Sequence, residues 1–252
     1  MTNTKQKTPQ DWIIDSLIYI FKNKDNYLGD FLKDDAYKYV LKAYADKYSN
    51  SYIEENGKLF NMYWDSFSED DIKLIRESII VSEESVKKLN NLIGKNKTKT
   101  EFRNALKEML HLEHLTPMRY SREKLCKLNQ ASVNYESVKE CFKYSAIALI
   151  TKDEAKKLDS KKTGGVVRKE DIDLLVELLA PKEEIIEAEK LKKDKKSLKD
   201  NGNGLLRLIH LYNLGVIFVD LNDEPIDLNC LVNMLKNNKF EIGQYAKKQI
   251  KI

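Results

Sequence analysis

Side chains able to do chemistry gather in one short stretch of the sequence, LKEMLHLEHLTP. Its acidic and imidazole side chains are Glu108, His111, Glu113 and His114, and they include two of the three histidines of the chain. On a helix, Glu108, His111 and His114 follow one another at i, i+3 and i+6 and lie roughly on one face. Both histidines could then reach one metal ion, since imidazole is a common metal ligand. The alternative is an amphipathic helix with ordinary surface histidines.

The segment around this cluster is basic. From Lys95 to Lys124 it holds eight Lys or Arg and four Glu, so it carries a charge equal to the net charge of the whole chain, +4. Arginine and lysine bind phosphates, a carboxylate can hold a divalent metal ion, and a neutral histidine can take a proton from water. The segment therefore predicts phosphodiester hydrolysis. The expected nucleic-acid contacts are Arg103, Arg119, Arg122 and Lys124, and the expected ligands of a divalent metal ion, Mg²⁺, are Glu113 and His111.

The run Glu113-His114-Leu115-Thr116-Pro117 resembles the (Asp/Glu)-His-x-x-Pro opening of the HNH, or ββα-metal, endonucleases. The resemblance implies that Glu113 is a metal ligand and that His114 is the general base. Downstream, LCKLN is similar to the Leu-Cys-x-x-Cys-Asn run of the same family and implies that Asn129 is its middle residue. The family has a second cysteine at the position of Leu128, and a β-hairpin where this sequence reads as helix.

A second nuclease signature follows the apolar run YSAIALI. Glu154-Ala155-Lys156 resembles the E-x-K triplet of restriction-type nucleases, in which the acid and the lysine point from a strand toward one metal ion. Here Thr151 and Glu154 match a capping box, which predicts that a helix begins at Lys152. The cap then explains Glu154, and Lys156 would point away from the helix on a different side from Glu154. The histidine cluster is therefore the favoured site.

The spacing of apolar residues and of turn signals predicts an α+β fold that is predominantly helical, with a few short strands and a C-terminal β-hairpin. Helices are expected over 9–21, 31–48, 68–79, 82–93, 100–116, 121 onward, 152 onward, 168–180, 181–200, 205–213 and 227–237, and strands over 58–67, 144–150 and 216–221. The polar run 95–99 predicts a boundary between an N-terminal helical domain, 1–95, and an α+β domain, 96–252. A single domain is the alternative.

The last third of the chain suggests a second class of function. Helices 168–180 and 205–214 and the hairpin 216–227 follow the order of a winged helix, in which the hairpin is the wing and Arg207 contacts phosphate. On this alternative the protein binds nucleic acid and catalyses nothing. We interpret the acids around the hairpin as turn chemistry and an N-cap at Asp227, and His210 as an ordinary core or surface histidine.

Composition and missing motifs exclude several classes of protein. With 252 residues, 42% of them hydrophobic, the chain can bury a core, and 9 Gly, 4 Pro and 3 Cys exclude collagen-like and disulfide-scaffold proteins. Cys126, Cys141 and Cys230 form no C-x-x-C pair, and no signal-peptide or membrane-spanning run is visible, so we expect a cytoplasmic protein. Phosphate-loop, Rossmann and nucleophile-elbow motifs are missing.

Together, the histidine cluster and the basic segment around it predict a metal-dependent DNA endonuclease of restriction or mobile-element type.

Overall fold

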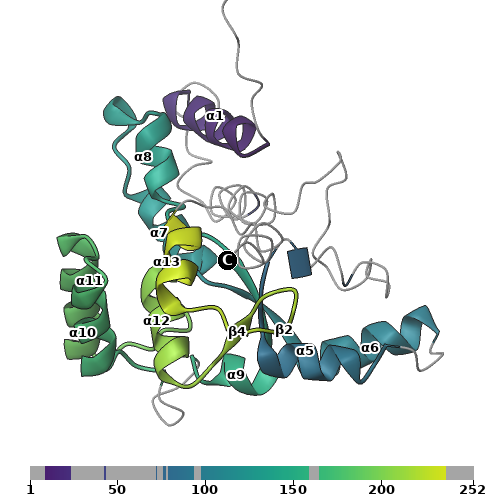
Figure 1. The fold of residues 1–252 in the computed structure, drawn as a ribbon. Helices are drawn as coiled ribbons and strands as arrows, with labels where there is room; N and C mark the ends of the chain where they lie inside the picture. Colours follow the sequence, from purple (N-terminus) through teal and green to yellow (C-terminus); the bar gives the residue numbers. More distant parts are fainter. Residues whose placement is uncertain are drawn as a thin grey trace, which may run out of the picture.

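A computed structural model describes residues 9–23, 79–93, 98–158 and 165–236, with the isolated positions 43, 72, 76 and 77 (Figure 1). Apart from residue 43, the predicted helix 31–48 and the predicted strand 58–67 lie outside the described residues. The described elements form an α+β fold in which helices surround one small mixed sheet. The predicted fold class is therefore confirmed.

Four short strands form the central sheet in the order β2-β3-β1-β4. Their bounds are β1 Ile80–Ser82, β2 Leu110–His114, β3 Ile147–Thr151 and β4 Phe218–Val219. Strand β3 runs parallel to β1 and antiparallel to β2, and β4 runs antiparallel to β1. Every residue of β3 is buried, as the apolar run 144–150 predicted. The sequence analysis missed β1, because a strand of three residues is too short to show a period of two.

The helices described are α1 Pro9–Lys22, α5 Glu83–Asn90, α6 Lys99–Met109, α7 Met118–Cys126, α8 Tyr135–Glu140, α9 Lys152–Lys156, α10 Lys169–Glu177, α11 Lys182–Lys193, α12 Gly204–Asn213 and α13 Leu228–Lys236. The predicted caps Ser82, Thr151 and Asp227 are confirmed, since each accepts a hydrogen bond from a backbone N–H three residues on. Two predicted starts are wrong: Thr98 rather than Thr100 caps α6, and α7 follows Pro117 directly. None of these helices combines the length and the apolar composition needed to cross a bilayer.

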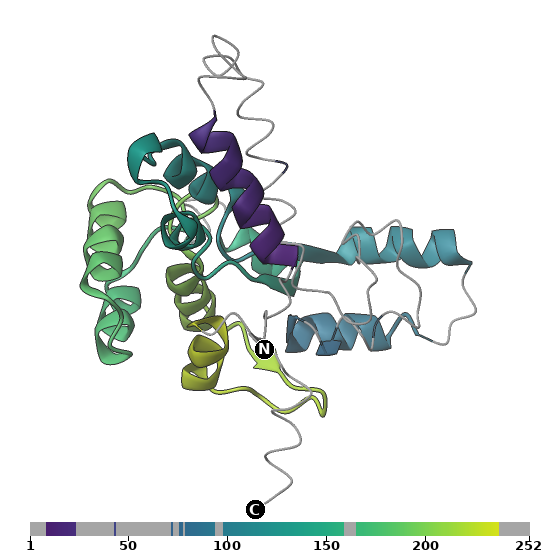
Figure 2. The ribbon, with the colours of Figure 1, turned by 90° about the horizontal axis from the view of Figure 1, so that it is seen from above.

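The two faces of the sheet are covered by different helices. Helices α5 and α6, which lie side by side in Figure 2, pack on the face that carries Val81, Leu149 and Val219. The other face carries Ile80 and Ala148 and is covered mainly by α12 and α13, with α10 and α11 packed further out. Strand β1 lies between β3 and β4, so the sheet joins residues from both sides of the predicted boundary at 95/96.

Candidate functional site

The stretch LHLEH, residues 110–114, is the edge strand β2, so the helix predicted here is wrong beyond residue 109. At Leu110 the backbone turns extended, with φ −114° and ψ 159°. Leu110 and Leu112 alternate with His111 and Glu113, and a period of two is typical of a strand that buries one face. This alternation is visible in the sequence. The helix prediction overlooked it because it continued the apolar stripe of α6.

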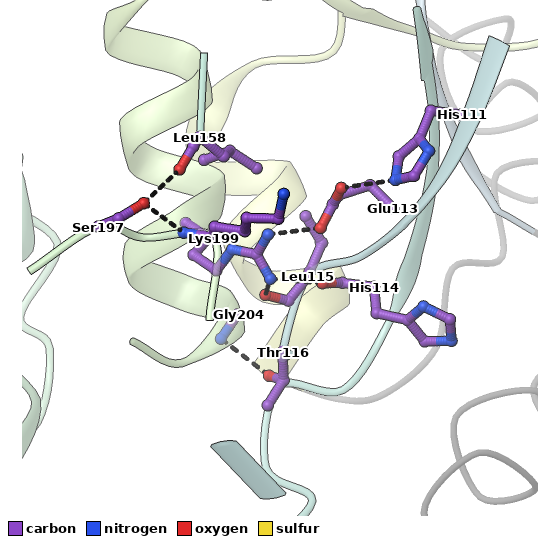
Figure 3. Close-up of polar contacts among 10 residues, drawn as sticks. His111, Glu113, His114, Leu115, Thr116, Leu158, Ser197, Lys199 and Gly204 are labelled. Carbon is purple, nitrogen blue, oxygen red and sulfur yellow. Dashed lines mark hydrogen bonds and ion pairs between the residues drawn. The ribbon is translucent and has the colours of Figure 1, made fainter. Parts of the chain in front are cut away.

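Strand β2 places the two histidines on opposite faces of the sheet. His111 and Glu113 point toward the face covered by α12, whereas His114 is in register with Ile147 on the face covered by α5 and α6 (Figure 3). The predicted arrangement of Glu108, His111 and His114 on one helical face is therefore wrong. Glu108 lies exposed on α6.

His114 is half-buried, and one of its two ring nitrogens is inaccessible. Its Nε2 atom is buried and has no hydrogen-bond partner in the described part of the chain. Burial lowers the pKa of His114, and the charges of Arg207 and His111 lower it further against the opposite effect of Glu113. The ring is therefore neutral at pH 7, but its Nε2 is buried and not available to a substrate.

His111 and Glu113 form a contact that does suit proton transfer. His111 Nε2 lies 3.0 Å from Glu113 Oε2, and the two side chains are 47% and 13% exposed. A carboxylate only accepts hydrogen bonds, so this contact places the ring proton of a neutral His111 on Nε2. Nδ1 then keeps its lone pair and can accept a proton from a molecule beside the strand.

The other oxygen of Glu113 accepts a hydrogen bond from Arg207 of α12. Arg207 is 1% exposed, and its Nη1 donates to the carbonyls of His114 and Leu115, at 2.7 and 3.0 Å. Burial by itself would raise the pKa of Glu113, but the charges and hydrogen bonds of Arg207 and His111 outweigh it and hold the pKa below its usual value. Glu113 is therefore ionised at neutral pH.

A cavity of about 560 Å³ opens beside this pair. Its charged lining residues are Arg119, Arg122, Lys152, Lys156, Lys199 and Arg207, against Glu113 and Asp200; His111, His114, Pro117, Met118 and Ala155 complete the wall. Of the predicted nucleic-acid contacts, Arg119 and Arg122 thus lie beside His111. Arg103, on α6, and Lys124, whose Nζ lies 4.7 Å from the centre of the Tyr120 ring, are not among the lining residues.

Acidic neighbours neutralise only part of this positive charge. Arg119 pairs with Glu123 at 2.9 Å, and Lys156 pairs with Asp153 at 2.8 Å. Arg122 and Lys152 have no ion pair within the described ranges. The cavity therefore keeps an excess of cations that suits an anion such as a phosphate group.

The E-x-K triplet contributes Ala155 and Lys156 to the same cavity, and Lys152 at the start of α9 lies there too. Glu154 is 7% exposed, and its Oε2 accepts hydrogen bonds from the N–H of Thr151 and from the hydroxyl of Ser82, both at 2.7 Å. The predicted capping box is confirmed, and Glu154 does not line the cavity with Lys156. The histidine cluster and the E-x-K triplet were alternative sites in the sequence analysis. In the structure, Lys156 of the triplet lines the same cavity as His111.

The contacts of Glu113 do not fit the predicted Mg²⁺ site. Mg²⁺ is held by several oxygen ligands in octahedral geometry, but Oε1 of Glu113 accepts from Arg207 and Oε2 faces His111. Among the described residues, no three or more His, Cys, Asp or Glu side chains are grouped to hold a metal ion. Both oxygens of Glu113 are thus engaged by protein groups and not available as metal ligands.

The surroundings of Glu113 also differ from those implied by the HNH resemblance. Helix α6 precedes β2, and the partner strand β3 follows only after α7 and α8, so no β-hairpin leads into His114. Asn129 caps a short 3₁₀ turn, Gln130–Ser132, where its Oδ1 accepts from the N–H of Ala131 at 3.0 Å. A local capping role accounts for this side chain, which does not line the cavity.

The winged-helix arrangement is not observed. All residues of α12 from Gly204 to Leu211 are buried, so this helix offers no face to a DNA groove, and the guanidinium of Arg207 bonds Glu113 and the carbonyls of His114 and Leu115. A Cβ on Gly204 would lie 2.1 Å from the carbonyl oxygen of Tyr144, which shows how closely α12 packs. The predicted wing contains β4, which pairs with β1 in the sheet.

His210, on the same helix, is a core residue. It is fully buried, and its Nδ1 lies 2.7 Å from Asp171 Oδ2. This pair joins α12 to α10 and lies outside the cavity.

Arg207 is the residue of the site whose role the sequence analysis missed. The available signal was a lone arginine inside the apolar run LLRLIHLYN, and a charge at such a position needs a buried partner. No family model, curated protein or solved structure matches the chain.

Proposed function

We propose that the protein is a nuclease that cleaves phosphodiester bonds in the cavity beside His111 and Glu113. One observation carries the proposal: a single cavity joins this histidine–carboxylate pair to Lys and Arg side chains of α7, α9 and the turn before α12. Cleavage of a phosphodiester requires cations that stabilise the negative charge and a base that activates the nucleophile. A surface that only binds anions needs the cations but no base.

The proposed roles follow from exposure and hydrogen bonding. His111 is the general base, because its Nδ1 can accept the proton of the nucleophile while Glu113 fixes the ring and stabilises the imidazolium that forms. This assignment replaces His114, whose Nε2 is buried. Arg122 and Lys152 bind the phosphate, since neither is neutralised by an acid in the described residues.

DNA, the substrate that the sequence predicts, is the first candidate, with water as the nucleophile. RNA is a second candidate, and the contacts of Glu113 favour it. Because both oxygens of this carboxylate are already engaged, a substrate that supplies its own nucleophile suits the site. The 2′-hydroxyl of RNA lies next to the phosphorus atom: His111 would take its proton, the 2′-oxygen would bond to phosphorus, and the bond from phosphorus to the 5′-oxygen would break, with the leaving oxygen taking a proton from water.

Cleavage assays on two substrates test the proposal. The full chain is incubated with supercoiled plasmid and with end-labelled single-stranded RNA, each in Mg²⁺ and in EDTA. We expect cleavage of at least one substrate that persists in EDTA, because the proposed base needs no metal. Cleavage that stops in EDTA would restore the predicted metal role. Binding of both substrates without cleavage would contradict the nuclease and support the binding module.

The phosphate-binding role of the cavity predicts a specific salt dependence. Arg122→Ala should weaken binding to unrelated sequences to a similar extent and reduce the slope of log K against log salt concentration by about one unit, because one phosphate contact is lost. Fluorescence anisotropy of labelled oligonucleotides at several salt concentrations measures both quantities. Lys124→Ala is the matched control, since Lys124 lies on the same helix but does not line the cavity. Equal slopes in the two variants would exclude Arg122 as a phosphate ligand.

A further inference from the structure

A chain of contacts leads from the buried helix α12 to the exposed ring of the proposed base. Arg207 donates to Glu113, and Glu113 faces His111 through its other oxygen (Figure 3). The exposed fraction of the side chain rises along this chain, from 2% for Arg207 to 13% for Glu113 and 47% for His111. In this series of contacts, His111 is therefore the residue that can meet a substrate, and Arg207 is the residue fixed in the core.

The contacts of Arg207 hold the end of β2 at consecutive residues. Its guanidinium bonds the carboxylate of Glu113 and the carbonyls of His114 and Leu115. Arginine suits this geometry because its planar fork carries five N–H groups in fixed directions, whereas lysine carries one compact charge on a flexible stem. The guanidinium therefore fixes both the position of the strand end and the orientation of the carboxylate.

Packing alone does not explain a charged residue at this position. The neighbours of Arg207 on α12 are the buried Leu206 and Leu208, and a buried ion pair is commonly no more stable than an apolar group of the same volume. The other side of Glu113 faces a histidine at the cavity rather than the core. Glu113 therefore links a buried residue, Arg207, to a residue at the cavity, His111.

We infer that Arg207 is a positioning residue, which holds Glu113 in the orientation that fixes the ring of His111 in the cavity. This inference rests on the proposed function, since the site it serves is the proposed one. Arg207 lies in the cavity wall, but the role we assign to it is indirect, because its two Nη atoms already bond Glu113 and the carbonyls of His114 and Leu115.

Steady-state kinetics separate positioning from substrate binding. Arg207→Lys should lower kcat by about 10- to 100-fold with little change in KM, because side chains that orient a reacting histidine act on the rate. Arg122→Lys, the same substitution at a cavity residue proposed to bind phosphate, should mainly raise KM. A rise in KM without loss of kcat in Arg207→Lys would overturn the inference.

A double-mutant cycle tests whether Arg207 acts through Glu113. In the Glu113→Gln background, Arg207→Lys should cause little further loss of kcat, whereas the effect of Arg122→Lys should combine independently. If the loss of kcat in the double variant equals the product of the two single losses, Arg207 and Glu113 act separately. This result would contradict the inference.

The inference also has a readout that does not depend on activity. The chain has three histidines, so nitrogen-15 NMR of the imidazole rings is simple to assign by substitution. The His111 signals should shift in Arg207→Lys and in Glu113→Gln and stay unchanged in Arg122→Lys. If wild type cleaves no substrate, the proposed function fails while this measurement still tests the positioning.

Glu113→Gln provides a second test in case Arg207→Lys does not fold. It keeps Arg207 and its hydrogen bonds to the two carbonyls, so we expect the fold to persist. Unfolding in urea checks this for each variant. Unchanged His111 signals in a folded Glu113→Gln protein would refute the chain of contacts as a positioning device.

Discussion

His111→Ala should reduce the rate of cleavage by about 100- to 10,000-fold and leave the affinity for nucleic acid close to that of wild type. The reason is that a general base lowers the barrier of the reaction and contributes little to binding of the ground state. Single-turnover rates on the cleaved substrate measure the first quantity, and anisotropy titrations measure the second. Circular dichroism confirms that the variant is folded.

His114→Asn is the control that separates the two candidate bases. It keeps a polar side chain at a residue whose Nε2 is buried, so we expect a rate near that of wild type. The HNH resemblance implies the opposite order, with His114 as the base. An inactive but folded His114→Asn protein beside an active His111→Ala protein would show that the resemblance assigns the base correctly and that our assignment is wrong.

Signals confined to a few neighbouring residues predicted much of the local structure correctly. The capping box of Thr151 and Glu154 predicted the start of α9, and Asp227 caps α13 as predicted. The apolar run before Thr151 predicted the buried strand β3. These predictions succeed because caps and buried strands depend on contacts within about one turn or one short run.

The errors concern residues whose structure depends on distant partners. Residues 110–114 continue a helical pattern in the sequence, yet they pair with β3 more than thirty residues away. The partner of Glu113 is Arg207, and 94 positions separate the two. No local period encodes such a pair, so the sequence could place Glu113 in a basic segment but could not identify what the carboxylate touches.

The composition of the cavity shows the same limit. Its basic residues come from α7, α9, α12 and the turn that precedes α12, and these three helices lie far apart along the sequence. The sequence predicted Arg119 and Arg122, because they lie close to the histidine cluster along the chain. Lys152 and Lys199 could not be predicted in this way, since the fold alone brings them beside His111.

The helix that carries Arg207 is itself fixed by a second buried charge. Asp171 of α10 and His210 of α12 are both fully buried, with Asp171 Oδ2 2.7 Å from His210 Nδ1. Asp171 also accepts hydrogen bonds from the N–H of Arg168 and from Asn213 Nδ2, each at 2.8 Å. His210 lies about one turn beyond Arg207 on α12. The position of Arg207 therefore depends on contacts between α10 and α12.

Asp171→Asn should lower the free energy of unfolding by about 3 kcal/mol at pH 7, because it removes one charge of a buried, hydrogen-bonded pair. Urea denaturation measures this change, and Asp173→Asn, on the exposed side of the same helix, should alter it by less than about 0.5 kcal/mol. A similar loss in both variants would show that the buried pair contributes nothing specific.

The stability conferred by Asp171 should also depend on pH. Burial alone would raise the pKa of this carboxyl, but the hydrogen bonds from His210, Arg168 and Asn213 outweigh it and lower the pKa below its usual value. A carboxyl whose pKa is lower in the folded state stabilises the fold at pH values above its unfolded pKa of about 3.9. This stability is lost as the pH falls through the folded value, so the difference between wild type and Asp171→Asn should narrow below about pH 4. A difference that stays constant between pH 7 and pH 3 would show that the shape of the side chain, and not its charge, holds α10 against α12.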